Sequence, residues 1–306
     1  MNVIQHIIHF SKLFWKSGKE FFKEDPFGHA AEIAFYTIFS MPGVLIVVIS
    51  IAGSIYDREV VTGGVMDQVG YMIGPDSADE VRSILENAAD SGGSKLARIV
   101  GIATLLFSAT TVFISLQGAL NHIWRIRSKP SKGFLKLLMD RVLSFAMVIS
   151  IGFMLLVSLV LDAVLVVLGD SLQQLTGIDL VFAGIINLIL SLLVIAVIFA
   201  LMFKILPDAI IRWKDVWVGA FITTFLFMAG KYLIGFYLGN SSLGSAYGTA
   251  GSLVLILVWI YYSAIIFLFG AQFTHVYGTQ NGKEIKPTKN AVKIRILELE
   301  DDEAEN

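Results

Sequence analysis

Charged and amide side chains interrupt several long apolar stretches of this chain, and these are the groups whose types could do chemistry. Such groups are costly inside a bilayer and usually face the interior of a helix bundle. One candidate cluster combines a carboxylate, an amide and an amine, namely Asp162, Asn187 and Lys231. The functional interpretation is a polar step on a translocation path. The alternative is a structural ion pair between helices, or side chains that reach the nearby interface.

A second candidate cluster lies toward the opposite ends of the apolar stretches. Its members are polar or helix-interrupting residues: Glu32, Tyr36, Ser40, Pro42, Gln117, Asn121, Arg141 and Gln272. Glu32 and Arg141 carry opposite charges and are expected to neutralise each other. The set is typical of an inward-facing site for a polar headgroup or an ion. The alternative is capping of helix ends at the level of the headgroups.

Several other kinds of chemistry are excluded, because the sequence lacks the residues that they need. The chain has no cysteine, which excludes disulfides, thiolate catalysis and zinc-thiolate sites. Its five histidines follow no metal-binding spacing such as H-E-x-x-H, and no G-x-x-x-x-G-K-[ST] nucleotide motif occurs. We therefore expect no enzyme, no metal and no cofactor. Any transport would have to use an ion gradient or the gradient of the substrate itself.

Composition places the chain in a membrane. Of its 306 residues, 56% are hydrophobic and only 16% are charged, and the mean hydropathy is +0.74. Soluble domains carry about a quarter charged residues. A helix of about 20 apolar residues crosses the bilayer core and satisfies its own backbone hydrogen bonds. The predicted fold class is therefore all-α, a polytopic membrane protein with six transmembrane helices.

The six predicted spans position both clusters. They form a membrane domain of residues 1–278 and cover about 33–54, 97–119, 143–168, 181–204, 216–238 and 251–275. Asp162, Asn187 and Lys231 each lie six or seven residues from the same end of their spans, which is about 10 Å below the surface. Pro42 is expected to kink or break the first span. Gly219 and Thr223 form a small-x-x-x-small pair, which favours close helix packing.

Three segments outside the predicted spans have an expected structure of their own. Residues 3–24 mix apolar residues with lysines and are expected to form an amphipathic helix on the membrane surface. The alternative is a cytosolic helix packed on the bundle. The acidic segment 55–96 is expected to form a small helical cap of two short helices, with a helix start at Gly74-Pro75-Asp76. Residues 279–306 are expected to form a partly disordered polar tail.

The distribution of Lys and Arg predicts the orientation of the chain. On one side of the spans only Arg58, Arg82 and Lys95 occur. Apart from Arg98 and Lys231 inside spans, the rest of the 23 Lys and Arg residues lie in the segments of the other side: 1–32, 120–142, 204–215 and 276–306. Because positive segments stay in the cytoplasm, both termini are predicted to be cytoplasmic and the cap extracytoplasmic.

Three blocks of this sequence resemble the YihY/virulence factor BrkB family. They run from Ala31 to Pro42, from Leu105 to Trp124 and from Tyr247 to Phe273. The resemblance implies a six-span protein of the bacterial inner membrane without a settled activity. It also implies links to envelope integrity, serum resistance or lipid export, and some members carry the older name ribonuclease BN. Members often have G-A-E-F where this chain has Gln272, so an ion-binding role of that carboxylate would be lost here.

Two functions from different classes remain. The leading hypothesis is that the protein transports or flips a lipid-like or amphiphilic substrate for the cell envelope. The alternative is a non-transporting membrane scaffold or regulator of envelope assembly that docks through the acidic cap. The residues argue against ribonuclease chemistry, because no carboxylate cluster is suited to two metal ions. Membrane lipids are the expected partners and nucleic acid is not, while a homo-oligomer is compatible with the sequence.

Overall fold

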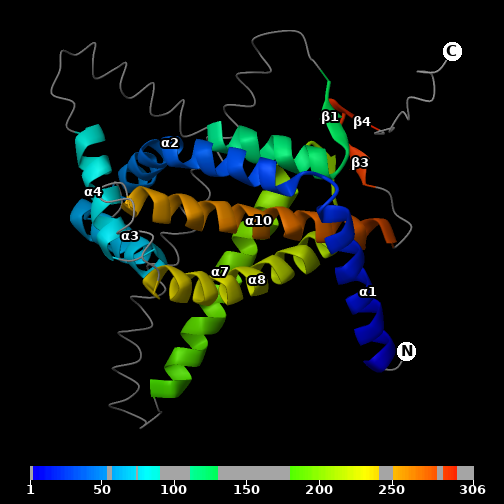
Figure 1. Ribbon diagram of the computed structural model, residues 1–306, viewed down its shortest axis with the longest axis horizontal. Helices are drawn as coiled ribbons and strands as arrows, with labels where there is room; N and C mark the ends of the chain where they lie inside the picture. Colours follow the sequence, from blue (N-terminus) through cyan, green and yellow to red (C-terminus); the bar gives the residue numbers. More distant parts are fainter. Residues whose placement is uncertain are drawn as a thin grey trace.

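The computed structural model describes residues 3–53, 57–73, 75–89, 111–129, 180–240, 251–280 and 285–294 (Figure 1). Within these ranges the protein is mostly helical. The predicted span 143–168, with Arg141 and Asp162 beside and within it, lies outside the described residues. The predicted span 97–119 is described only from residue 111 onward.

Three long apolar helices form the centre of the structure: α2 (Pro26–Ala52), α8 (Trp213–Asn240) and α10 (Gly251–Gln280). Each contains a stretch long and apolar enough to cross a membrane, with mean hydropathies of 2.1, 1.5 and 2.5. The shortest stretch has 22 residues, and at about 1.5 Å per residue its length matches a bilayer core of about 30 Å. Helix α10 lies between α2 and α8 and runs antiparallel to both (Figure 1).

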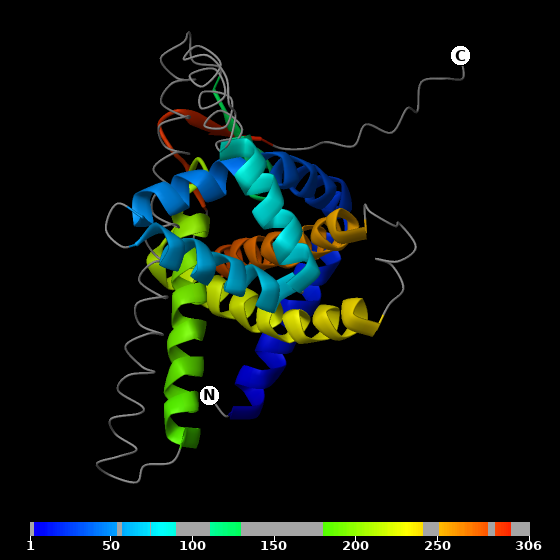
Figure 2. The ribbon, with the colours of Figure 1, turned by 90° about the vertical axis from the view of Figure 1, so that its left-hand side faces the viewer.

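Two further helices border this central row. The helix over residues 111–123 lies along α2, and α7 (Leu180–Ile205) packs against α8 while crossing the row at a steep angle (Figures 1 and 2). The largest buried side chains gather where these helices converge. Trp124, Phe203 and Leu268 are at most 1% exposed in that core.

Helices α8 and α10 meet along a seam of small residues. A side chain on Gly219 would overlap the hydroxyl of Thr274, and one on Gly270 would overlap the hydroxyl of Thr223. Both threonine hydroxyls donate to carbonyls of their own helix, at 2.8 Å, so both are satisfied within the seam. The Gly219/Thr223 pair therefore packs closely, as its spacing predicts, and α10 supplies a matching glycine–threonine pair.

Helix α2 begins earlier than hydropathy predicts. Asp25 has a φ of 44° and its carboxylate accepts a hydrogen bond from the backbone of Gly28 at 3.2 Å, so Asp25 caps the helix before Pro26. Hydropathy finds only the apolar part of a helix and misses a polar first turn. At Pro42 the helix continues without interruption, so the break that was one expected outcome there is absent.

Helix α1 (Val3–Phe21) lies across one end of the bundle and contacts α10 (Figures 1 and 2). Its buried side is formed by Leu13, Ser17 and Phe21. Aromatic rings continue the contact, because Phe14 and Phe21 lie 5.1 and 5.5 Å from the ring of Phe269. One face of α1 is therefore packed on the bundle.

Helices α3 (Arg58–Ile73) and α4 (Pro75–Ala89) lie at the opposite end of the bundle from α1 (Figure 1). They are the two short helices expected in the acidic segment, and α4 begins at the predicted proline. Val61, Met66 and Val81 pack against Ile49 of α2 and Ile256 of α10. This hydrophobic contact fixes the pair on the bundle.

Four short strands tie three connecting segments together at the α1 end. Strand β1 (Ile126–Ser128) pairs antiparallel with β4 (Ala291–Lys293), and β2 (Ala209–Ile210) pairs with β3 (Lys286–Pro287). The all-α prediction missed these strands, because two or three residues are too few to show a period of two. Part of the expected tail is thus ordered. We call the two strand pairs, β1 with β4 and β2 with β3, the strand clasp.

Candidate functional site

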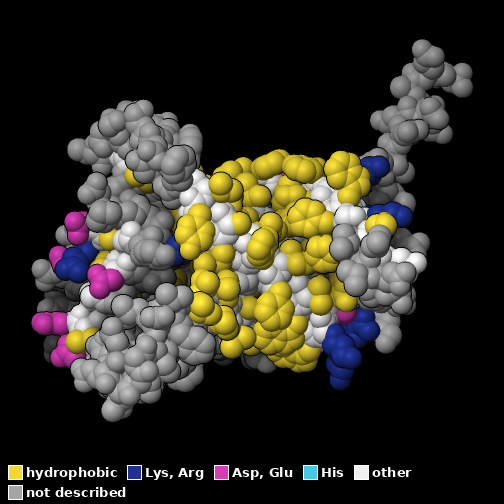
Figure 3. All heavy atoms as spheres, turned by 90° about the horizontal axis from the view of Figure 1, so that it is seen from below, with side chains coloured by type: hydrophobic (Ala, Val, Ile, Leu, Met, Phe, Trp, Pro, Cys, Tyr) yellow, Lys and Arg dark blue, Asp and Glu magenta, His cyan; other side chains and the backbone are white. Residues whose placement is uncertain are grey.

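The surface of the bundle has a broad hydrophobic belt between two charged ends (Figure 3). On α8 the belt includes Phe221, Phe225, Tyr232 and Leu233, whose exposed fractions run from 54% to 72%. Contiguous apolar surface of this kind is rare on proteins that face only water. It fits contact with lipid chains.

A set of polar side chains lies at the end of the belt where α1 crosses the bundle. We call this set the basic-end polar layer; its members are Glu20, Glu24, His29, Asn121, His122, Arg125, Asp208, Gln272 and His275. They come from α1, the α1–α2 turn, α2, the helix over 111–123, the α7–α8 connection and α10. The layer is therefore assembled from distant parts of the chain.

Glu24 joins the start of α2 to the end of the helix over 111–123. Its carboxylate is 9% exposed and contacts Arg125 at 2.9 Å and His122 at 3.3 Å. Arg125 has a φ of 54°, which ends the helix and turns the chain toward β1. The left-handed residue at the helix end thus supplies the guanidinium that neutralises a nearly buried carboxylate.

Two imidazoles extend this contact toward the surface. The rings of His29 and His122 lie 4.8 Å apart between centroids. His29 Nδ1 lies 3.8 Å from the carboxylate of Glu32, whose side chain is half exposed. Carboxylate, imidazole, imidazole and carboxylate therefore form a continuous row from Glu24 to Glu32.

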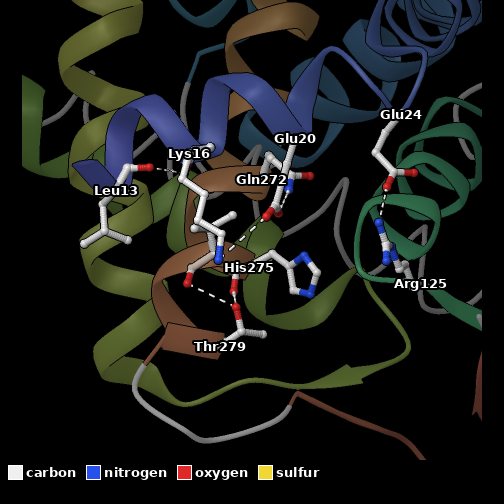
Figure 4. Close-up of polar contacts among 10 residues, drawn as sticks. Leu13, Lys16, Glu20, Glu24, Arg125, Gln272, His275 and Thr279 are labelled. Atoms are coloured by element: carbon white, nitrogen blue, oxygen red, sulfur yellow. Dashed lines mark hydrogen bonds and ion pairs between the residues drawn. The ribbon is translucent and has the colours of Figure 1, made fainter. Parts of the chain in front are cut away.

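Gln272 and His275 bring α10 into the layer, as Figure 4 shows. Gln272 is 2% exposed, and its Nε2 donates to Glu20 at 3.2 Å. Because an ionised carboxylate can only accept hydrogen bonds, the amide must turn its nitrogen to Glu20 and its oxygen away. Within the described residues neither Gln272 Oε1 nor His275 Nδ1 has a hydrogen-bond partner, although both are buried.

The surroundings of these two atoms are charged. Glu20 also contacts Lys16 at 3.8 Å. Arg125 and Lys293 lie close enough to His275 to act on it electrostatically. In Figure 4 His275 is drawn below the Glu20–Gln272 pair, with Arg125 to its right.

Asn121 has a structural role within the layer. Its Nδ2 donates to the Asp208 carboxylate at 3.0 Å, and its Oδ1 accepts from the Asp208 backbone at 2.9 Å. The hydroxyl of Ser128 donates to the same carboxylate, and the Asp208 carbonyl accepts from Thr288. These bonds fasten the α7–α8 connection to β1 and β3.

A family model described as Virulence factor BrkB matches residues 18–295. The chain belongs to the virulence factor BrkB family. The match includes every member of the basic-end polar layer.

Relatives of the BrkB-family chain are bacterial membrane proteins. It is 29% identical to a UPF0761 membrane protein of Verminephrobacter eiseniae over 86% of this chain and 63% of that one. It is 29% identical to the UPF0761 membrane protein YihY of Salmonella typhimurium, over 67% of each chain. A relative in Delftia acidovorans is 32% identical over 58% of this chain and 40% of that one. The chain thus spans less than two thirds of two of these three relatives. No solved structure matches.

The predicted inner cluster of this BrkB-family protein divides into separate contacts. Gln272 binds Glu20, Asn121 binds Asp208, and Glu32 pairs with His29. Tyr36 is half-buried on α2 with its ring against Phe35, Ser40 is buried further along α2, and Gln117 is half-buried. Because Arg141 lies outside the described residues, its pairing with Glu32 stays a prediction.

The predicted outer cluster is only partly described. Lys231 is half-buried on α8, and Asn187 lies in the first half of α7, which packs on α8. Asp162 lies outside the described residues, so its pairing with Lys231 stays a prediction. Among the described residues, no group of three His, Asp or Glu side chains is placed to hold a metal ion.

Sequence reasoning missed most members of the layer. It found no metal-binding spacing among the five histidines, and it gave no role to Glu20 and Glu24 within the amphipathic segment 3–24. The contact of Glu24 with Arg125 spans 101 residues and that of Glu20 with Gln272 spans 252. No local spacing signals such pairs; only the excess of polar types near helix ends could have pointed to them.

Proposed function

We propose that this protein binds the polar headgroup of a lipid-like, amphiphilic molecule at the basic-end polar layer and moves it across the bacterial inner membrane. One observation carries the proposal. Gln272 Oε1 and His275 Nδ1 are buried among charged pairs at the end of an apolar belt, without partners among the described residues. An arriving polar group would satisfy both atoms.

The energy of unpaired polar atoms supports this proposal. Leaving a buried donor or acceptor unsatisfied costs about 1–3 kcal/mol. A ligand hydroxyl can donate to Gln272 Oε1, and neutral imidazole can donate or accept at Nδ1. The lysine and arginine side chains nearby suit an anionic group, while the belt suits the apolar chains of the same molecule. A basic site next to an apolar belt favours an amphiphile over a small ion.

The orientation belongs to the same proposal. We assign the end that carries α1, the strands and the polar layer to the cytoplasm, and α3 with α4 to the outside. The support is the concentration of Lys and Arg in segments at the α1 end and the acidic character of the other end. The proposed headgroup site then opens toward the cytoplasmic leaflet.

The test is flipping of headgroup-labelled lipids in proteoliposomes. Wild-type protein is expected to expose labelled inner-leaflet lipid to a membrane-impermeant quencher faster than empty vesicles do. Gln272→Leu and His275→Phe should each reduce this rate at least several-fold. Gln280→Leu removes the same amide from the exposed end of α10 and should leave the rate unchanged.

The outcomes decide between functions. Flipping that depends on Gln272 and His275 supports the proposal. No flipping by folded wild-type protein, over a panel of anionic and zwitterionic headgroups, contradicts transport. Loss of a co-purifying protein on deletion of residues 60–92 would then favour the scaffold alternative.

A further inference from the structure

Helix α1 has a second face that is mostly exposed in the described structure, although at its end the ring of Phe22 lies 5.9 Å from the ring of Phe27 of α2. Ile8 and Trp15 of α1 and Phe22, the residue directly after it, follow one another at intervals of seven residues. They lie along one line, because the Phe22 backbone still donates to the Gly18 carbonyl at 3.2 Å. Their exposed fractions are 47%, 79% and 67%. The packed residues Leu13 and Ser17 lie on the other side.

A row of positive charge adjoins this apolar line. Lys12, Lys16, Lys19 and Lys23 are all exposed. Within α1 the one acidic residue is Glu20, and it is engaged by Lys16 and Gln272. The free face of α1 therefore combines large apolar side chains with an excess of positive charge.

The position of α1 relative to the long helices indicates where its exposed face lies. The helix lies crosswise to α2, α8 and α10, at the end of the hydrophobic belt (Figures 1 and 2). If α2, α8 and α10 cross the membrane, a crosswise helix at their end lies in the plane of the interface. Tryptophan and lysine are the residues that anchor proteins at that depth.

We propose that α1 docks on an anionic lipid surface through Ile8, Trp15 and Phe22, with the four lysines bound to lipid phosphates. Charge complementarity selects this occupant, because anionic headgroups attract clustered lysines while the apolar line enters the boundary with the acyl chains. The proposal does not depend on transport: a scaffold could use the same anchor. It adds a function to the helix beyond its packing on α10.

Docking of α1 on lipid would also change contacts within the basic-end polar layer. Lys16 pairs with Glu20, and Glu20 accepts from Gln272. A lipid phosphate that binds Lys16 competes with Glu20 for this lysine. The charge of the membrane surface would thereby affect the hydrogen bond of Gln272, because Glu20 contacts both Lys16 and the Gln272 amide.

Quenching of Trp15 fluorescence tests the docking of the apolar line. The full chain is reconstituted in vesicles that contain anionic lipid, and the Trp15 signal is taken as the difference between wild type and Trp15→Phe. Lipids brominated near the headgroup should quench this signal, and aqueous iodide should not. Quenching by iodide would place α1 in water, and quenching by neither reagent would show that protein covers the face; either result overturns the proposal.

Removing two lysines of α1 tests whether this helix prefers anionic lipid. In native mass spectrometry Lys12→Gln/Lys19→Gln should retain less anionic lipid relative to zwitterionic lipid, by up to about fivefold per lysine. The matched control is Lys286→Gln/Lys289→Gln, which removes two exposed charges at the same end of the molecule. Equal loss in both variants would show general charge attraction and would contradict a specific role of α1.

Discussion

Gln272 joins the apolar bundle to its charged end. Its nitrogen donates to Glu20, and its buried oxygen has no partner among the described residues. The sequence identifies Gln272 because an amide in an apolar helix is costly. It does not identify Glu20 as the partner, because α1 has the pattern of a surface helix and the two residues are 252 positions apart.

Gln272→Glu places a second carboxylate against Glu20. Two carboxylates at hydrogen-bond distance cannot both stay ionised without repulsion, so the folded state should take up a proton. Stability should therefore be near that of wild type at pH 5 and lower at pH 8, by about 1–3 kcal/mol. Thermal unfolding in detergent at the two pH values measures this difference.

The control for this change is Gln280→Glu, at an exposed position of the same helix. It should show no pH-dependent loss relative to wild type. A Gln272→Glu protein that is equally stable at both pH values would show that its new carboxylate does not face Glu20.

Glu24→Gln should destabilise the protein. The change leaves Arg125 without its carboxylate and weakens the contact to His122. Glu24 is nearly buried but Arg125 is half exposed, so we expect a loss of about 1–2 kcal/mol, less than for a fully buried pair. Glu32→Gln, at a half-exposed carboxylate, should cost less than about 0.5 kcal/mol. Equal effects in unfolding experiments would contradict a special role for Glu24.

At the scale of elements, the structure rests on the seam between α8 and α10 and on the strand clasp. The sequence predicts one half of the seam, since Gly219 and Thr223 have a recognisable spacing. The partner half, Gly270 and Thr274, is recognisable only once α8 is known to face α10. The clasp had no sequence signal, because pairing of β1 with β4 depends on contacts between segments far apart.

Gly219→Ala should loosen this seam. The added methyl group would overlap the Thr274 hydroxyl, and crowding in a packed interface costs about 1–3 kcal/mol. Thr274→Ala in the same protein removes the overlapping atom and should restore part of the stability. Gly118→Ala is the control, because no atom of the described residues lies within 4 Å of the new methyl group there. A double variant no more stable than Gly219→Ala would argue against direct contact.

At the scale of the whole molecule, an apolar belt separates a basic end from an acidic end (Figure 3). Composition and hydropathy predict the membrane class because they sum over the chain. The polar layer could not be predicted in this way, since its members come from six parts of the chain. Asn121 shows the difference: its type marked it for the inner cluster, while its hydrogen bonds to Asp208 hold the α7–α8 connection in place.

Cysteine labelling in whole cells tests the proposed orientation. The chain has no cysteine, so a single introduced thiol reports its own position. Ser83→Cys on α4 should react with a membrane-impermeant maleimide applied outside the inner membrane. Asn290→Cys, between β3 and β4, should react only after the membrane is permeabilised. The reverse pattern would invert the orientation.

Lipid retention in native mass spectrometry tests the central claim most directly, with gently extracted wild-type protein beside Gln272→Leu and Gln280→Leu. We predict that the wild type and Gln280→Leu keep a specific amphiphile with a polar headgroup, and that folded Gln272→Leu loses it. Retention of the same molecule by all three proteins, or by none, would contradict a headgroup site at the basic-end polar layer.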